Sequence, residues 1–176
     1  LIYRYHKPLC DHISNEEHLR KLYLLPRGTY KTTLITKSNS IRQILRNPNI
    51  RILLVAATAD NAQKFLWEIR SHFENNATLR WLFPELIPDF KKANRWNNSE
   101  ILLVRDKSYS EATVEAIGVG GILTSRHYDV HVKDDLINEE ICESPTELEK
   151  TKRWLAFSES LFVNPATARE YVVGTR

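Results

Sequence analysis

RILLVAATADNAQKFLWEIRSHFENN, residues 51–76, carries the clearest structural signal in this chain. It begins with an unbroken apolar run from Ile52 to Ala57, which predicts a strand buried on both faces. Asp60 is then the expected N-cap of a helix, because the next apolar residues recur at helical spacing: Ala62, Phe65, Leu66, Ile69 and Phe73. A buried strand followed directly by a helix is typical of an α/β domain with a mostly parallel sheet.

Further strands and helices are expected on both sides of this unit. The pattern of apolar runs and turn residues predicts strands over 20–26, 99–105, 112–121, 127–135 and 170–175. Helices are expected from about Lys31 and over 144–161, where Ser144, Pro145 and Glu147 are typical of a helix start. Strands that alternate with helices predict an α/β fold whose sheet is covered on both sides.

Composition indicates one domain, because 176 residues with 42% hydrophobic content can form a single proper core. No apolar run approaches the ~20 residues that span a bilayer. Cys10 and Cys142 fit neither a disulfide framework nor a zinc site and are interpreted as reduced thiols. The chain has no methionine and ends in a predicted strand, so we expect a piece of a longer protein.

Charge is distributed unevenly along the chain. Residues 1–60 carry ten Lys and Arg against four Asp and Glu, whereas residues 128–176 carry six against ten. A basic front half could attract the phosphates of a nucleotide or of DNA, although a mixed, solvated surface is the commoner explanation.

LLPRGTYKTT, residues 24–33, joins a predicted strand to a predicted helix and partly matches a phosphate-binding loop. Lys31 and Thr32 fit the lysine and hydroxyl of the G-x-x-x-x-G-K-[ST] pattern, but Leu25 and Tyr30 stand where glycines are expected. Gly28 still gives the turn some freedom. Two interpretations stay open for the loop taken alone: a phosphate cradle, or a plain strand–turn–helix connection with a solvated lysine.

YDVHVKDDL, residues 128–136, supplies the acidic strand end that nucleotide hydrolysis on this architecture also needs. Asp134 is the candidate for the Mg²⁺ shell and Asp135 for the residue that polarises the attacking water. An Asp-Asp pair that begins a turn is the alternative. His131 and Lys133 make this strand less apolar than a strand beside a phosphate loop is expected to be.

Taken together, five segments resemble the ATPase domain of the large terminase subunit, the DNA-packaging motor of tailed bacteriophages. They are LLPRGTYKTT (24–33), NPNIRILLVAATADNAQKFLWEI (47–69), LFPEL (82–86), GVGGILTSRHYDVHVKDDLINEE (118–140) and VVGTR (172–176). The resemblance implies a P-loop NTPase of the ASCE type, a three-layer α/β sandwich with a mostly parallel central sheet. ATP and Mg²⁺ are the implied cofactors.

The resemblance also implies roles for individual residues. Arg27 and Asp135 would be catalytic, with Arg27 acting in cis on the γ-phosphate and Asp135 standing where many members have glutamate. Thr32 and Asp134 would hold the metal, and Gly174 and Thr175 would form the coupling motif. The residues expected to bind the nucleotide are Arg27, Gly28, Thr29, Tyr30, Lys31, Thr32 and Thr33.

Residues 1–176 are accordingly expected to be the ATPase domain of a motor that drives double-stranded DNA into a procapsid. Expected partners are the portal, the small terminase subunit and further copies in a ring, with no membrane, in the cytoplasm of a bacterial host. A C-terminal nuclease domain is expected to be missing. Two alternatives stay open: a helicase-like translocase, and a degenerate P-loop module that binds without hydrolysis.

Other basic and aromatic residues are given structural roles. Arg126 is expected to face solvent. The segment DFKKANRWNN, residues 89–98, is interpreted as a polar loop with one packed tryptophan rather than as a nucleic-acid surface. Trp67, Trp81 and Trp154 are expected in the core because they lie in helical segments.

Overall fold

A computed structural model describes residues 2–123, 125–137 and 139–175. The chain forms an α/β domain around a six-stranded sheet with the order β1-β6-β5-β2-β4-β3. Every neighbouring pair is parallel except β3 with β4. The strands are β1 (Arg20–Leu25), β2 (Ile52–Ala56), β3 (Glu100–Ile101), β4 (Val114–Gly118), β5 (Val130–Asp134) and β6 (Arg169–Thr175).

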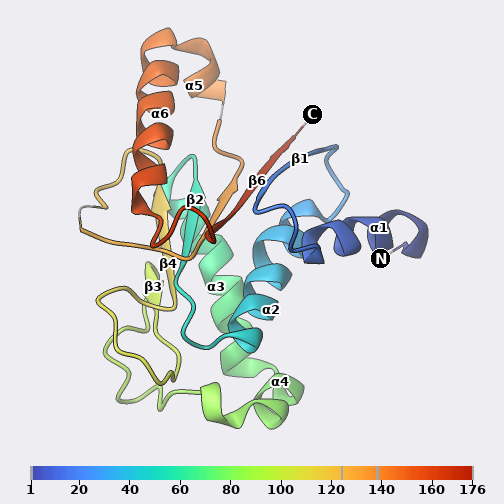
Figure 1. The fold of residues 1–176 in the computed structure, drawn as a ribbon, viewed down its shortest axis with the longest axis vertical. Coiled ribbons are helices and arrows are strands. Elements are labelled where there is room, and N and C mark those ends of the chain that lie inside the picture. The colour runs from blue at the N-terminus through green and yellow to red at the C-terminus, as the bar shows by residue number, and fades with distance from the viewer. Residues whose placement is uncertain (1, 124, 138, 176) are drawn as a thin grey trace.

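Helices flank this sheet on both sides, as Figure 1 shows. The α-helices are α1 (Tyr3–Ser14), α2 (Asn39–Arg46), α3 (Ala59–Asn75), α4 (Ala77–Leu82), α5 (Glu139–Glu143) and α6 (Pro145–Ser158). Three further helical segments are the π-helix η1 (Thr32–Ser38) and the 3₁₀ turns η2 (Pro84–Leu86) and η3 (Glu159–Leu161). The expected mostly parallel α/β sheet is therefore confirmed, and its layers are compatible with a three-layer sandwich.

The unit formed by β2 and α3 lies at the centre of the core, as its sequence predicts. All five residues of β2 are buried, because Ile52, Leu54 and Ala56 face the cluster under α2 and α3 while Leu53 and Val55 face α6. The N-cap of α3 is Thr58 rather than Asp60: its side chain accepts a hydrogen bond from Asn61 N at 3.3 Å. Asp60 lies inside the first turn, where a negative charge is favourable.

Several elements at the edges of the fold differ from the predictions. The short apolar run over 20–26 suggests a buried strand, but β1 is buried on one face only: Leu22 and Leu24 on its other face remain 64% and 52% exposed. The predicted strand over 99–105 shortens to β3. Trp67 and Trp81 were wrongly expected in the core: they are 55% and 78% exposed, because they lie on the outer sides of α3 and α4.

The chain direction brings four strand ends to one edge of the sheet. Because β1, β6, β5 and β2 are parallel neighbours, the segments that follow them meet there. This is the edge at which open α/β sheets bind their ligands. Within the described part of the chain, no helix is long and apolar enough to cross a membrane.

Candidate functional site

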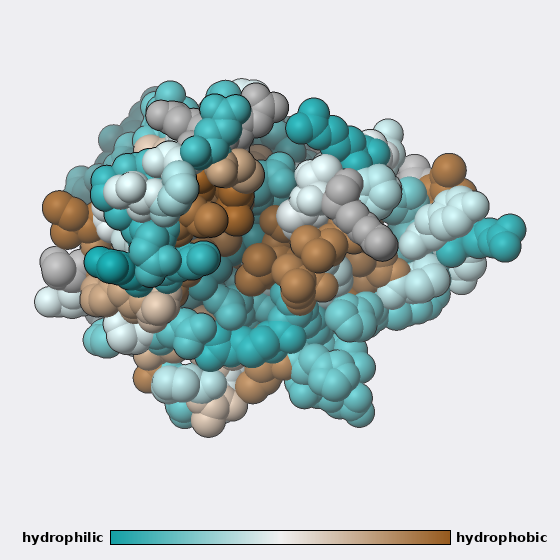
Figure 2. All heavy atoms as spheres, turned by 90° about the horizontal axis from the view of Figure 1, so that it is seen from above, coloured by the Kyte–Doolittle hydropathy of each residue, from teal (hydrophilic) through white to brown (hydrophobic). Residues whose placement is uncertain are grey.

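An open pocket of about 1150 Å³ lies at this edge of the sheet. Its polar lining includes Arg27, Lys31, Asn61, Asp135 and Thr175, and its apolar lining includes Leu22, Leu24, Leu136, Ile137 and Val172. Figure 2, which views the molecule from the top of Figure 1, shows apolar side chains exposed near the middle of that face, surrounded by hydrophilic ones. Glu143 also lines the pocket, which thus combines two cations and two carboxylates with an apolar wall.

The loop between β1 and η1 adopts a turned backbone. Gly28 has a φ of 81° and Tyr30 a φ of 57°, both in the left-handed region. Thr29 donates its hydroxyl to the carbonyl of Pro26 at 2.8 Å and so closes the turn. Tyr30 takes the conformation that glycine adopts most easily, although its bulky side chain makes it unfavourable. A left-handed residue followed by the right-handed Lys31 is the combination that forms an anion-binding nest of backbone N–H groups.

Lys31 is buried at the start of the helix, with only 7% of its surface exposed. Its Nζ donates to Thr175 Oγ1 at 2.9 Å, across the sheet from β1 to the end of β6. No carboxylate forms an ion pair with Lys31 in the described part of the chain. A buried ammonium held by a neutral hydroxyl keeps its charge available for an anion in the pocket.

Asp134 is fully buried at the end of β5 and faces η1. Its Oδ2 accepts a hydrogen bond from Thr36 Oγ1 at 2.5 Å, whereas its Oδ1 has no partner among residues 2–123, 125–137 and 139–175. Burial raises the pKa of this carboxyl, and the hydroxyls of Thr36 and Thr32 oppose the shift. One oxygen of this buried carboxylate therefore accepts no hydrogen bond in the described part of the chain, which makes it the candidate atom for contact with a ligand.

Asp135 leaves the strand in a left-handed conformation, with a φ of 45°. Its backbone N donates to Val173 O at 3.0 Å, and its carbonyl accepts from Ala57 N at 3.2 Å. Aspartate tolerates this conformation better than most residues. The turn places the side chain in the pocket, where Oδ1 accepts a long hydrogen bond from Thr175 Oγ1 at 3.4 Å.

The structure brings part of the predicted set into one pocket: Arg27, Gly28, Lys31, Asp135, Gly174 and Thr175. The other predicted residues do not line it: Thr29, Tyr30, Thr32, Thr33 and Asp134. Asp134 is instead covered by η1. Arg176, which closes the quoted VVGTR motif, lies outside the described residues.

Two residues at this site were not anticipated from the sequence. Thr36 holds Asp134, and Asn61, in the first turn of α3, lines the pocket. No simple sequence signal marks Thr36, because its contact depends on the wide turn of the π-helix. Asn61 could have been suggested by its place just after a buried parallel strand.

The donor set around Asp134 fits a hard cation such as Mg²⁺. Magnesium prefers oxygen ligands and is commonly bound by one or two carboxylates together with substrate phosphates. The unpartnered Oδ1 of Asp134 and the nearby hydroxyl of Thr32 are both oxygen donors of this kind. Both can therefore contribute to a magnesium site beside the pocket.

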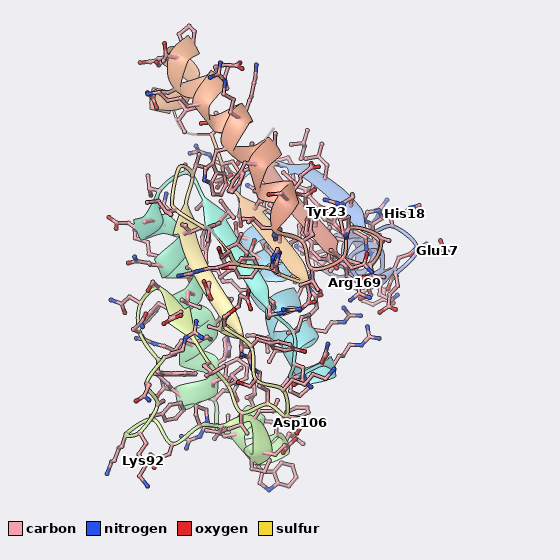
Figure 3. The ribbon with its side chains drawn as sticks, turned by 60° about the vertical axis from the view of Figure 1, so that its left-hand side comes forward. Glu17, His18, Tyr23, Lys92, Asp106 and Arg169 are labelled. Atoms are coloured by element: carbon pink, nitrogen blue, oxygen red, sulfur yellow. The ribbon has the colours of Figure 1, made fainter. Side chains whose placement is uncertain are left out.

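Arg95 and Arg126, two basic residues outside the pocket, are engaged in structural contacts. Arg95 pairs with Glu100 at 2.6 Å and with Glu115 at 3.3 Å, and Arg126 also pairs with Glu115. Figure 3 shows Lys92 at the end of the molecule away from α6. The segment 89–98 therefore takes no part in the pocket.

A comparison of the chain with protein-family models and with curated proteins finds no match. The function is therefore inferred from the arrangement of these residues.

Proposed function

We propose that this chain binds ATP together with Mg²⁺ and hydrolyses it, as a P-loop ATPase of the ASCE type. Residues 1–176 would be its ATPase domain. The wider proposal, taken from the resemblance to large terminase subunits, is that hydrolysis moves double-stranded DNA into a procapsid. The portal, the small terminase subunit and further copies of the chain are the partners of such a motor.

The observation that carries the proposal is Lys31. A buried lysine normally needs a carboxylate partner, because an uncompensated buried charge is costly. In the described part of the chain Lys31 forms no ion pair, although the carboxyl of Asp134 is close enough to interact with its charge. Its Nζ donates to the Thr175 hydroxyl, and it lies under a turned loop that can present backbone N–H groups to an anion. A polyphosphate is the anion that would use both features, with Arg27 as a second cation from the same loop.

The remaining groups fit the hydrolysis step. Arg27 and Lys31 can stabilise the negative charge that spreads over the transferred phosphoryl group. Asp135, at the pocket surface, can orient a water molecule toward the terminal phosphorus, so that a new P–O bond forms as the bond to ADP breaks. Asp134 and Thr32 would hold Mg²⁺, which would supply positive charge to neutralise the charge that develops on the phosphates.

The strand order supports the ASCE assignment. The strand β6 lies between β1, which leads into the loop, and β5, which carries the acids. This added strand brings Thr175 within hydrogen-bonding distance of both Lys31 and Asp135. These two contacts support the proposal that Thr175 responds to the nucleotide and transmits its state.

Equilibrium titration with a fluorescent ATP analogue and Mg²⁺ tests the proposal at the binding step. Lys31→Met removes a charged contact worth about 1.5–3 kcal/mol, so the affinity should fall by about 10- to 100-fold. Lys37→Met is the matched control, because Lys37 lies on the same helix but pairs with Glu68 at 2.6 Å. It should bind like the unmodified chain.

Equal affinities for all three proteins would contradict a phosphate site at Lys31. Binding that depends on Lys31, without any release of phosphate, would favour a module that binds the nucleotide but does not hydrolyse it.

A further inference from the structure

The helix that follows the loop opens as a π-helix, η1, over seven residues from Thr32 to Ser38. π-Helical turns are rare and occur frequently at functional sites. Within η1, Thr36 is fully buried and donates its hydroxyl to Asp134 Oδ2 at 2.5 Å. Ser40 in turn donates to the carbonyl of Thr36 at 2.5 Å. A buried chain of hydrogen bonds therefore runs from α2 through η1 to the end of β5.

This series of hydrogen bonds determines which oxygen of Asp134 is left without a partner. Because Oδ2 is engaged by Thr36, the carboxylate cannot turn freely, and Oδ1 is left as its unpartnered atom in the part of the chain described. A carboxylate held by a hydrogen bond on one oxygen presents the other in a fixed direction. Hydrogen-bonded partners orient metal-ligating carboxylates in this way.

We propose that Thr36 is the positioning residue for the metal site: it aims the free oxygen of Asp134 at the Mg²⁺ that accompanies the nucleotide. The proposal rests on the proposed function, since it takes Asp134 as a metal ligand. Thr36 itself does not touch the metal. It acts through Asp134, and losing such a partner typically weakens metal binding by about 10- to 100-fold.

Thr36 differs from the other hydroxyl residues of the same helix. The hydroxyl of Thr32 also acts on the carboxyl of Asp134, but Thr32 follows the loop lysine and is the candidate for direct contact with the metal. Ser38 supplies a control: Ser38 and Thr36 lie on one helix, but Ser38 is exposed whereas Thr36 is buried against β5.

The test measures Mn²⁺ binding in the presence of ADP, following free Mn²⁺ by electron paramagnetic resonance. Four forms of the full chain are compared: unmodified, Thr36→Val, Thr36→Ser and Ser38→Ala. We expect Thr36→Val to weaken Mn²⁺ binding by about tenfold or more. Thr36→Ser should rescue it, because the hydroxyl is kept, and Ser38→Ala should have no effect.

A second titration, with ADP and no metal, separates positioning from general damage. Thr36→Val should leave this affinity unchanged, whereas a disturbed loop would lower it. If the valine variant does not fold, Thr36→Ala, which cannot clash, replaces it with the same expectation.

The outcomes are distinct. Mn²⁺ affinity of the valine or alanine variant equal to that of the unmodified chain would overturn the role of Thr36. The role of Thr36 would also be overturned if this variant lost affinity for ADP without metal by the same factor as it lost affinity for Mn²⁺. Failure of the unmodified chain to bind ADP and Mn²⁺ at all would instead overturn the proposed function, and the present inference with it.

Discussion

Lys31 and Lys133 are both buried lysines that contact residues of β6, but their surroundings differ. Lys133, in β5, is 4% exposed and pairs with the carboxylate of Glu170 at 2.5 Å. Lys31, at the start of the helix after the loop, is 7% exposed and donates a hydrogen bond to the hydroxyl of Thr175 at 2.9 Å. Glu170 also pairs with Arg20 at 3.0 Å, which holds the interior pair in place.

The difference separates a structural lysine from a candidate functional one. The charge of Lys133 is neutralised inside the fold, so the pair contributes to the folded state and offers nothing to a ligand. The charge of Lys31 has no carboxylate partner among the described residues, and it lies beside an open pocket. A sequence pattern cannot distinguish two such lysines, but their partners can.

Substitutions of the acids near the two lysines should have opposite effects: at Asp135 on activity, and at Glu170 on stability. Asp135→Asn should lower single-turnover ATP hydrolysis by about 10²- to 10⁴-fold, the usual contribution of a positioned general base. Nucleotide affinity should change little, because the substitution acts on the chemical step. Rapid-quench hydrolysis and nucleotide titration on the same preparation measure both. A fully active variant would mean that another group orients the water.

Glu170→Ala should lower the stability of the fold rather than act on the chemical step. It leaves Lys133 buried without its carboxylate, so the free energy of unfolding should fall by about 3 kcal/mol. Urea denaturation measures this, with Glu147→Ala as the control, because Glu147 forms only an exposed pair with Lys150. A loss as small as that of the control would remove the structural role assigned to the interior pair.

His131 gives the interior of β5 a pH dependence. Its ring is buried against Phe162, with a centroid distance of 3.9 Å, and burial together with the charges of Lys133 and Arg20 lowers its pKa from 6.5 to about 3. Below pH 6.5 the unfolded chain binds a proton that the folded chain does not. Stability should therefore fall as the pH decreases from 6.5 toward 3, by about 1.4 kcal/mol per pH unit.

His131→Leu should remove this slope, so that the variant gains about 2 kcal/mol over the unmodified chain between pH 6.5 and pH 5. Thermal or urea unfolding at the two pH values measures the difference. The exposed His18, seen at the edge of the molecule in Figure 3, supplies the control His18→Gln. Parallel pH profiles for the unmodified chain and His131→Leu would show that His131 titrates normally.

Asp134→Asn is expected to have the smallest effect on stability, and in the favourable direction. Burial raises the pKa of Asp134, so its ionised form destabilises the fold at neutral pH. A neutral side chain of the same shape should stabilise the protein by on the order of 1 kcal/mol. Mn²⁺ binding with ADP should be lost at the same time. A variant that is less stable and still binds Mn²⁺ would contradict the role of Asp134 as a buried metal ligand.

The fold was predictable where one local pattern dominated. The apolar run of β2 and the helical spacing of Ala62, Leu66 and Ile69 depend only on neighbouring residues, and both predictions are confirmed. The edge position of β1 was not predictable, because it depends on which strands pair. The exposure of Leu22 and Leu24 was not predictable either, because it depends on which face of β1 is covered by other elements.

The site was predictable in its components and less so in its connections. Motif spacing and the family resemblance identified Lys31, Asp135 and Thr175, which the parallel strand order brings to one pocket. The contact between Thr36 and Asp134 depends on a π-helical turn, which has no simple sequence signature. The burial of His131 depends on Phe162, which comes from a distant segment.

Phosphate release from ATP, with Mg²⁺ and with excess chelator, tests the central claim most directly. At high protein concentration, the unmodified chain should release phosphate only when Mg²⁺ is present, and Lys31→Met should reduce the rate to background. The rate is expected to be slow, because the packaging motors that the sequence resembles complete their sites with neighbouring subunits, and an arginine supplied in trans can add ~10³-fold or more. Release that is independent of Mg²⁺, or equal in the unmodified chain and Lys31→Met, would contradict an ATPase site at this edge of the sheet.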